Sequence, residues 1–374
     1  MDEILARRLQ QIGKKFKLNS PFFSYEEIHQ GNVNHTYRVD YIHDDGTGMA
    51  RIKNYLVQRV NTYAFRDPVA LMENIDKVTE YIHAKRPKQT CLHYHHTDDG
   101  KTYFFECDEF WRICNYIPSV TYDTCENIEI VRSAAGAFGD FQIALAEFDV
   151  SQLSYTIPDF HNTRKRYETL IADAEEDKLG RVKNVREELD YLLSVQDLAC
   201  KLTDMEKAGE LPIRVTHNDT KINNVLFDEN TRKAIVVIDL DTVMPGLVAH
   251  DFGDAVHFAA NFTEEDSEET EKTGVDLNTF WAFADGFLSK TANMLTQTEI
   301  DTLGISGFVL ACELASRFLD DYITGDKYFK IKKDNHNVIR ARCQIALAKD
   351  MYKKLDAMDA IVHGCAEKYR KQPQ

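Results

Sequence analysis

The first third of the chain is rich in short apolar and aromatic runs of the kind that form β-strands. β-Branched and aromatic residues dominate segments 35–43 and 51–60, and residues 44–48 between them are typical of a turn. Segments 101–106 and 110–117 repeat this pattern across a shorter turn. We therefore predict two β-hairpins that belong to one small antiparallel sheet.

Helical spacing follows the first hairpin and returns later in the chain. Asp67 and Pro68 are residue types preferred at the cap and the first position of a helix, and four apolar residues then recur at helical intervals: Leu71, Ile75, Val78 and Ile82. From about residue 127 onward the same periodicity dominates, most clearly in two sets of residues: Ala134, Phe138, Phe141, Leu145 and Phe148, and Phe308, Cys312, Ala315, Leu319 and Tyr322. Only segment 213–241 interrupts it, with short apolar strands.

These elements predict an α+β protein. A small antiparallel β-sheet with one helix forms the N-terminal lobe over residues 1–116, and residues 117–374 form a larger, mainly helical C-terminal lobe. Segment 261–276 is rich in acidic residues and poor in apolar ones. We predict a solvated surface loop there, with a substrate lid as the alternative.

Composition and charge narrow the classes of partner. The 374 residues carry a formal net charge of −16, which argues against nucleic acid, because phosphate backbones are bound by clustered Lys and Arg. Residues 1–16 lack the features of a secretion signal, and no continuous apolar run approaches the ~20 residues that span a bilayer. We therefore expect a cytoplasmic protein, a monomer or a homodimer, whose partner is a small molecule.

Cysteine and histidine positions do not suggest a metal motif. The eight cysteines are scattered without a Cys-x-x-Cys pair, which favours reduced and mostly buried thiols. His93, His95 and His96 precede a turn at residues 98–100 and lack a matching set of carboxylates or thiolates. We interpret them as the end of an exposed loop rather than a metal site.

The candidate chemistry lies in segment 215–245, which contains the runs THNDTKINNVLF and KAIVVIDLDTVMPG. These runs place Asp219, Asn224 five residues later, and Asp239 beyond a hairpin turn among apolar strands. Phosphoryl transfer needs a carboxylate that accepts the proton of the attacking hydroxyl, and oxygen ligands that hold Mg²⁺ against the nucleotide phosphates. The spacing predicts Asp219 for the first role and Asn224 with Asp239 for the second.

This ordered pattern resembles a known superfamily. His217, Asp219, Asn224, Asp239 and Asp241 match the catalytic pattern of the aminoglycoside phosphotransferases and choline kinases, which have a protein-kinase-like, two-lobed fold. The chain is more closely similar to the bacterial N-acetylhexosamine 1-kinases, through seven runs along nearly its whole length: THNDTKINN, VIDLDTVMPG, DFGD, AFGDFQ, EFDVSQL, DKLGR and RFLDDYITGDKYF. The resemblance implies ATP and Mg²⁺ as cofactors and phosphorylation of the anomeric hydroxyl of an N-acetylhexosamine.

The resemblance also implies roles for individual residues. Asp219 is the catalytic base or proton acceptor. His217 supports the catalytic loop, with direct proton transfer as the alternative. Lys221 either offsets charge on the transferring phosphoryl group or is a solvated neighbour. Asn224 and Asp239 are the metal ligands.

The nucleotide is expected at the N-terminal sheet. Segment 31–37 lies between two predicted strands and resembles the family's phosphate-covering loop, with four candidate contacts: Gly31, Asn32, Asn34 and Thr36. Kinases usually place a Lys on the third strand, but the matching run here is LVQRVN, so that either Gln58 or Arg59 stands in its place. Adenine is expected near the backbone of Asn115 and Ile117, where the lobes connect.

Candidate substrate residues come from three parts of the chain. On a strand, Asp241 would point the same way as Asp239, as a further, outer metal ligand or a sugar contact. Arg317 is a candidate sugar-facing cation, with a surface ion pair to Glu313, one turn away, as the alternative. Arg112 and Asn115 are further candidates.

We therefore predict a kinase for N-acetylglucosamine or N-acetylgalactosamine. The alternatives are a kinase for another small alcohol, such as choline, ethanolamine, homoserine or an aminoglycoside, and a non-catalytic nucleotide-binding relative.

Overall fold

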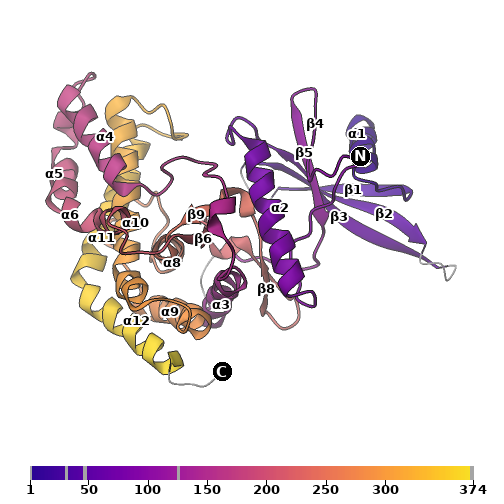
Figure 1. Ribbon diagram of the computed structural model, residues 1–374. Helices are drawn as coiled ribbons and strands as arrows, with labels where there is room; N and C mark the ends of the chain where they lie inside the picture. Colours follow the sequence, from indigo (N-terminus) through magenta and orange to yellow (C-terminus); the bar gives the residue numbers. More distant parts are fainter. Residues whose placement is uncertain (1, 30–32, 45–48, 124–126, 371–374) are drawn as a thin grey trace. The chain divides into compact units, whose positions relative to one another are not determined.

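The computed structural model describes residues 2–29, 33–44, 49–123 and 127–370 (Figure 1). The chain forms two compact units. The first unit contains Met1–Val120 together with two short later segments, Ser151–Ile157 and Ile238–Met244; the second contains Thr121–Val150, Pro158–Val237 and Pro245–Gln374. The units are therefore not separated by one cut after residue 116, and the segment that carries Asp239 belongs with the N-terminal sheet.

The first unit is built on a five-stranded sheet with the strand order β1-β2-β3-β5-β4, in which all neighbours are antiparallel. The strands are β1 (Phe22–Ile28), β2 (His35–Asp44), β3 (Ala50–Val60), β4 (Phe104–Glu106) and β5 (Glu109–Asn115). β2 pairs with β3 and β4 with β5, which confirms both predicted hairpins.

Two helices pack in the first unit, α1 (Glu3–Lys15) and α2 (Pro68–Lys85), where one helix was predicted. Leu9 and Ile12 of α1 are fully buried and share one apolar cluster with residues of β2, β3 and β5. α2 begins as predicted: the Asp67 side chain accepts a hydrogen bond from the backbone N–H of Ala70, and Pro68 occupies the first turn.

A buried Asn on α2 ties the two later segments to the first unit. The Asn74 side chain donates hydrogen bonds to the carbonyls of Ser154 at 2.7 Å and Val243 at 3.0 Å. Because Asn74 is 1% exposed, its amide cannot hydrogen-bond to bulk water and needs these two acceptors. The bonds fix segment 238–244 against α2.

The second unit is mainly helical, as predicted, and Figure 1 shows its helices in magenta, orange and yellow. Its helices are α3 (Ile128–Ala144), α4 (Thr163–Glu176), α5 (Arg186–Ser194), α6 (Gln196–Ala199), α7 (Lys201–Lys207), α8 (Val248–Ala259), α9 (Leu277–Thr291), α10 (Gln297–Thr324), α11 (His336–Lys353) and α12 (Leu355–Arg370). Three short strands interrupt them: β6 (Arg214–Thr216), β7 (Val225–Phe227) and β8 (Ala234–Val237), of which β7 and β8 form a hairpin. A further short strand, β9 (Met244–Gly246), precedes α8.

Helix α10 is the centre of the second unit. It packs against α4, α8, α11 and α12. Among the described residues it is the one helix that is long and apolar enough to cross a membrane, but 89% of its most apolar stretch is buried inside the structure. Such burial is typical of a core helix, and its apolar residues face neighbouring helices on several sides.

Three smaller predictions can be compared with the structure. Segment 261–276 is an irregular loop, and three of its acidic residues pair with the region before and within α11: Glu265 with Arg340, Asp266 with His336 and Glu268 with Lys333. The seven cysteines in the described ranges are free thiols, and five of them are buried. His93 and His96 lie beside Glu80 and Asp76, and no group of three or more His, Cys, Asp or Glu in the described part of the chain could hold a metal ion.

Candidate active site

The loop that carries Asp219 runs from β6 to β7 and is held by a buried carboxylate of α8. Asp251 accepts hydrogen bonds from the backbone N–H groups of Asn218 at 2.7 Å and His217 at 3.0 Å, and from the Gln142 side chain at 2.9 Å. Burial raises the pKa of Asp251, while His217 and these N–H groups oppose the rise. The backbone of Asn218 is left-handed, with φ of 64°, and the hydrogen bonds from the N–H groups of His217 and Asn218 to Asp251 hold it in this conformation.

His217 is buried below the same loop. Its ring meets Phe138 and Phe141 edge to face, with centroid distances of 5.6 and 6.0 Å. Its Nδ1 accepts a hydrogen bond from the backbone N–H of Asp219 at 3.3 Å. These contacts, and an exposed fraction of 0%, are those of a residue that supports the loop. A role of His217 in proton transfer stays a prediction.

Asp219 and Asn224 lie together, as their spacing suggests. The Asn224 amide donates to the backbone carbonyl of Asp219 at 2.8 Å and to its carboxylate at 3.0 Å. Lys221 contacts the other carboxylate oxygen at 2.9 Å. Burial opposes the charge of Lys221, but attraction to Asp219 and Asp254 raises its pKa, so that it stays a cation. The Asp219 carboxylate is therefore oriented by one neutral and one charged donor.

The second candidate segment, residues 238–244, lies in the first unit. Strand β8 ends at Val237, and Asp239 has a left-handed backbone with φ of 59°. Leu240–Thr242 then form one 3₁₀ turn. The expectation that Asp239 and Asp241 share one side of a strand is wrong, because the left-handed residue and the turn replace the alternation of a strand. Asp239 is exposed, whereas Asp241 is buried.

Asp241 is bound by two side chains of the first unit. The guanidinium of Arg112 forms a close ion pair with one of its oxygens, and the Asn34 amide donates to the other at 2.7 Å. The Asn34 side-chain oxygen accepts the backbone N–H of Asn61 at 2.9 Å. Arg112 was a candidate for contact with the sugar, but it is 1% exposed and does not lie on a surface that a substrate could reach.

The other nucleotide candidates lie on β2, β3 and β5 or beyond them. Gly31 and Asn32 fall outside the described residues. Gln58 donates to Thr36 at 3.1 Å and accepts from Arg112 at 2.9 Å, while Arg59 forms an ion pair with Glu109 at 3.1 Å. Adjacent residues of a strand point to opposite faces, so Gln58 shares the face of Arg112 and Arg59 does not. Which of the two contacts phosphate stays a prediction.

The predicted adenine segment follows β5. The Asn115 side-chain oxygen lies 2.9 Å from Nε2 of His95, and the carbonyl of Ile117 accepts a hydrogen bond from Ser119 at 2.8 Å. The side chain of Asn115 is thus held in place within the first unit, and the adenine contacts of this segment stay a prediction.

Comparison with known families decides the class of the protein. A model described as the phosphotransferase enzyme family matches residues 24–283. The chain belongs to this family. The match covers the sheet, the Asp219 loop and the Asp239 segment.

Solved structures confirm the predicted kinase-like α+β fold. A microcompartment-associated aminopropanol kinase is similar with a TM-score of 0.58 and 15% identity, covering 94% of this chain and 98% of that chain. A choline kinase from Cryptosporidium parvum Iowa II has a TM-score of 0.54 and 14% identity, with coverage of 96% and 99%. An aminoglycoside phosphotransferase from Alicyclobacillus acidocaldarius has a TM-score of 0.54 and 13% identity, with coverage of 96% of both chains. Such identities show the shared fold alone.

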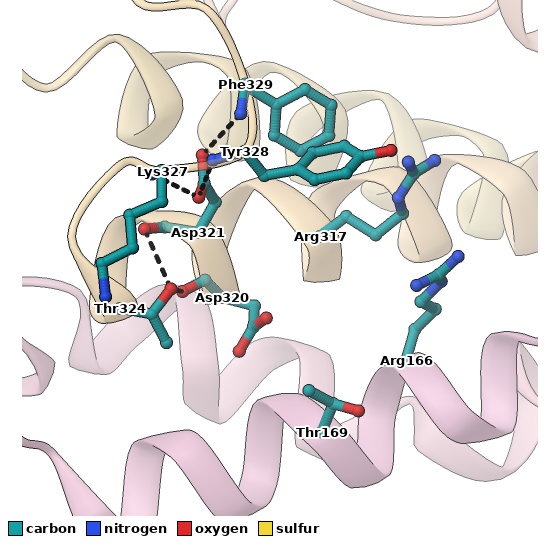
Figure 2. Close-up of a pocket in the computed structure, with 9 residues that line it drawn as sticks. All are labelled: Arg166, Thr169, Arg317, Asp320, Asp321, Thr324, Lys327, Tyr328 and Phe329. Carbon is teal, nitrogen blue, oxygen red and sulfur yellow. Dashed lines mark hydrogen bonds between the residues drawn. The ribbon is translucent and has the colours of Figure 1, made fainter. Parts of the chain in front are cut away.

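The second unit of the phosphotransferase contains a pocket of about 230 Å³ (Figure 2). Helix α4, helix α10 and the loop after α10 line it, with the residues Arg166, Thr169, Arg317, Asp320, Asp321, Thr324, Lys327, Tyr328 and Phe329. The guanidinium of Arg317 lies 5.8 Å from the centre of the Tyr328 ring and 5.4 Å from that of Phe329. A surface pair of Arg317 with Glu313 is wrong, because Glu313 is 2% exposed and bonded to His161 and Thr163.

Three cationic and two acidic side chains line the pocket of the phosphotransferase. Asp321 is bound by the backbone N–H groups of three loop residues, Lys327, Tyr328 and Phe329, at 2.8 to 3.0 Å. Burial and the neighbouring Asp173 raise the pKa of Asp320 to about 7, so this carboxyl is partly neutral at physiological pH. Burial, together with Arg317, lowers the pKa of Arg166. Nε of Arg166 and Oδ1 of Asp320 are buried without a hydrogen-bond partner in the described structure.

A buried ion pair adjoins this pocket. Nδ1 of His161 lies 3.1 Å from Glu313, whose other oxygen accepts from Thr163 at 2.6 Å, and the His250 ring is centred 4.9 Å from that of His161. Burial works against both charges, but the partners prevail: Glu313 raises the pKa of His161, and His161 lowers the pKa of Glu313 to about 2. Burial and the charge of His161 lower the pKa of His250 to about 3, which keeps it neutral.

Replacement of Glu313 by Gln is expected to lower the free energy of unfolding by about 3 kcal/mol near pH 5.5, because a buried imidazolium loses its partner. The raised pKa of His161 adds stability that is complete below its ordinary value of 6.5 and is lost at higher pH. The lowered pKa of Glu313 adds stability that is complete above 4.5 and is lost as the pH falls towards about 2. Urea unfolding at several pH values should show the largest difference from wild type between these limits. The exposed control Glu229→Gln should show none, and a pH-independent difference would contradict the account.

Three residues of these sites were not among the candidates from the sequence: Asp251 and Gln142, which hold the Asp219 loop, and Tyr328, which lines the pocket. All three lie within runs shared with the resembling kinases, DFGD, AFGDFQ and RFLDDYITGDKYF. The shared runs could therefore have drawn attention to these residues. Only the fold shows that Asp251 and Gln142 lie beside the Asp219 loop.

Proposed function

We propose that this phosphotransferase transfers the γ-phosphoryl group of ATP to the anomeric hydroxyl of N-acetylglucosamine or N-acetylgalactosamine. The product is the sugar 1-phosphate. Two observations support the proposal: the runs shared with N-acetylhexosamine 1-kinases extend along nearly the whole chain, and the pocket beside α10 has the chemistry of a site for a neutral sugar.

The proposed roles follow from the donors around Asp219. Its carboxylate would accept the proton of the sugar hydroxyl, and Lys221 would balance the charge of the transferring phosphoryl group. Asn224 and Asp239 each have the chemistry of a magnesium ligand: the amide nitrogen of Asn224 is bonded to Asp219, which leaves its oxygen as the ligand atom, and Asp239 is an exposed carboxylate. When bound, Mg²⁺ would neutralise charge on the phosphates.

The charge of the pocket is the observation that carries the choice of substrate. Arg166, Arg317 and Lys327 line it, while Asp320 is partly neutral and Asp321 is engaged by the loop backbone. A quaternary ammonium would need an aromatic cage, but the guanidinium of Arg317 already lies over both rings. A polycationic aminoglycoside would need an acidic pocket. Hydroxyl and acetamido groups instead accept hydrogen bonds from guanidinium groups.

A panel of acceptors tests the proposal. ATP consumption by the purified protein with Mg²⁺ should occur with N-acetylglucosamine, N-acetylgalactosamine or both, and not with choline, ethanolamine, homoserine or kanamycin. Turnover on one of the amines alone would keep the phosphotransferase and refute the sugar. Nucleotide binding without turnover on any acceptor would favour a non-catalytic relative.

Replacement of Arg317 by Met should raise the KM for the sugar by about tenfold or more and change the KM for ATP by less than about twofold, because one charged donor to the sugar is lost. Steady-state kinetics with each substrate varied in turn would measure this. The control is Arg186→Met, on the exposed side of α5, where Arg186 pairs with Asp190. An equal rise in both KM values would show that Arg317 does not contact the sugar.

A further inference from the structure

Arg112 is a buried cation for which the proposed reaction has no direct use. It lies on β5 with 1% of its surface exposed, and its partner Asp241 is 4% exposed. Burial of a charge pair is costly unless both groups are well paired and hydrogen-bonded, and an apolar pair of similar size would often be as stable. The pair therefore calls for an explanation other than stability.

Three neighbouring strands build the surroundings of Arg112. Thr36 on β2 lies opposite Gln58 on β3, which in turn lies opposite Arg112 on β5. Gln58 links the other two, since it accepts from Nε of Arg112 at 2.9 Å and donates to Thr36 at 3.1 Å. The Tyr94 ring lies 5.7 Å from the guanidinium. Burial opposes the charge of Arg112, yet the attraction of Asp241 raises its pKa and keeps it a cation.

Gln58 also occupies one of the two positions where a kinase usually carries its strand lysine. Its amide is neutral, and its oxygen is directed to Arg112. The sheet thus brings a cation to this face from β5 rather than from β3. The guanidinium of Arg112 pairs with Asp241, and its hydrogen bond to the Gln58 oxygen fixes its orientation.

The segment held by Arg112 has a strained backbone. Asp239 is left-handed, which is unfavourable for a residue with a side chain, and such a conformation persists only where the surroundings fix it. Two residues farther on, Asp241 is fixed by Arg112 and Asn34; Val243 is fixed by Asn74. Arg112 provides the one charged contact among these three anchors.

We infer that Arg112 is a positioning residue: through Asp241 it holds the 238–244 segment so that Asp239 is ready to bind the metal of the metal–nucleotide complex. Arg112 supplies a cation to this face of the sheet from β5, beside the neutral Gln58 on β3, and acts through Asp241 rather than on the phosphates. This inference rests on the proposed function, because it assumes that Asp239 binds the metal.

Nucleotide affinity measured with and without metal tests the inference. The dissociation constant of a fluorescent ATP analogue would be measured in excess EDTA and in excess Mg²⁺ for the wild type, Arg112→Gln, and the double variant Arg112→Gln with Asp241→Asn. In both variants the gain in affinity on addition of Mg²⁺ should fall by about tenfold or more, while affinity in EDTA changes by less than about twofold. The double variant leaves no unpaired buried charge, so it decides the question if the single variant unfolds.

The control is Arg38→Gln on β2, where Arg38 pairs with Glu26 and Asp40 in the same unit. It should keep the full gain from Mg²⁺. A folded double variant with the wild-type gain would overturn the inference alone. A similar loss of affinity in EDTA would also overturn it, because Arg112 would then bind the nucleotide itself. A wild-type protein without any gain from Mg²⁺ would overturn the proposed function and this inference together.

Discussion

Replacement of Asp219 by Asn is expected to lower turnover by about a thousandfold and to leave nucleotide affinity within about twofold of the wild type. The amide cannot accept the proton of the attacking hydroxyl. It keeps the shape of the carboxylate, so Asn224 retains one of its two acceptors, the backbone carbonyl of Asp219, at 2.8 Å. The buried His217 and Asp251 contacts of the loop involve the backbone and are not changed.

Single-turnover kinetics and nucleotide titration measure the two parts of this prediction separately. The matched control is Asp197→Asn on the exposed side of α6, which should retain both rate and affinity. Full activity of the Asp219 variant would contradict the role of the carboxylate as proton acceptor. A parallel loss of nucleotide affinity would show instead that the substitution disrupts the binding site.

Replacement of Asp251 by Asn is expected to lower turnover by about a hundredfold and the free energy of unfolding by about 2–3 kcal/mol. Its two carboxylate oxygens accept the N–H groups of Asn218 and His217, at 2.7 and 3.0 Å. The amide of Asn has only one oxygen. Its NH₂ group would therefore face one of these two buried N–H donors without an acceptor between them. The loop before Asp219 would then lose its left-handed turn at Asn218.

Asp276→Asn is a close control for this variant. Asp276 caps α9 and accepts the backbone N–H groups of Asn278 and Thr279, and at this half-buried cap Asn is as favourable a residue type as Asp. Urea unfolding and steady-state kinetics of the two variants should therefore differ. Wild-type turnover of Asp251→Asn would contradict the view that this carboxylate holds the catalytic loop.

The sequence predicts the hairpins and helices well because each depends on local spacing and caps. Asp67 with Pro68 begins α2, and the two hairpins follow from apolar and aromatic runs that flank short turns. Asp219 and Asn224 could be paired in the same way, since they are five positions apart within one short loop.

Contacts between distant segments could not be predicted from spacing. Asp241 meets Arg112 across 129 positions of the chain, and neither residue is marked locally as a partner of the other. The expectation for Asp241 is wrong because the strand ends at Val237. The backbone then turns at Asp239, so the alternation of the strand does not reach Asp241. Glu313 and Arg317 likewise have the spacing of a surface pair, and only the packing around α10 buries Glu313 with His161.

Phosphorus NMR of the reaction product identifies both the acceptor and the phosphorylated position. The phosphotransferase would be incubated with ATP, Mg²⁺ and N-acetylglucosamine or N-acetylgalactosamine, with Asp219→Asn as the inactive control. We expect a new phosphomonoester signal that the anomeric proton splits into a doublet and that is absent from the control reaction. A phosphomonoester coupled to the protons of C6, or no sugar phosphate while an amino alcohol is phosphorylated, would contradict it.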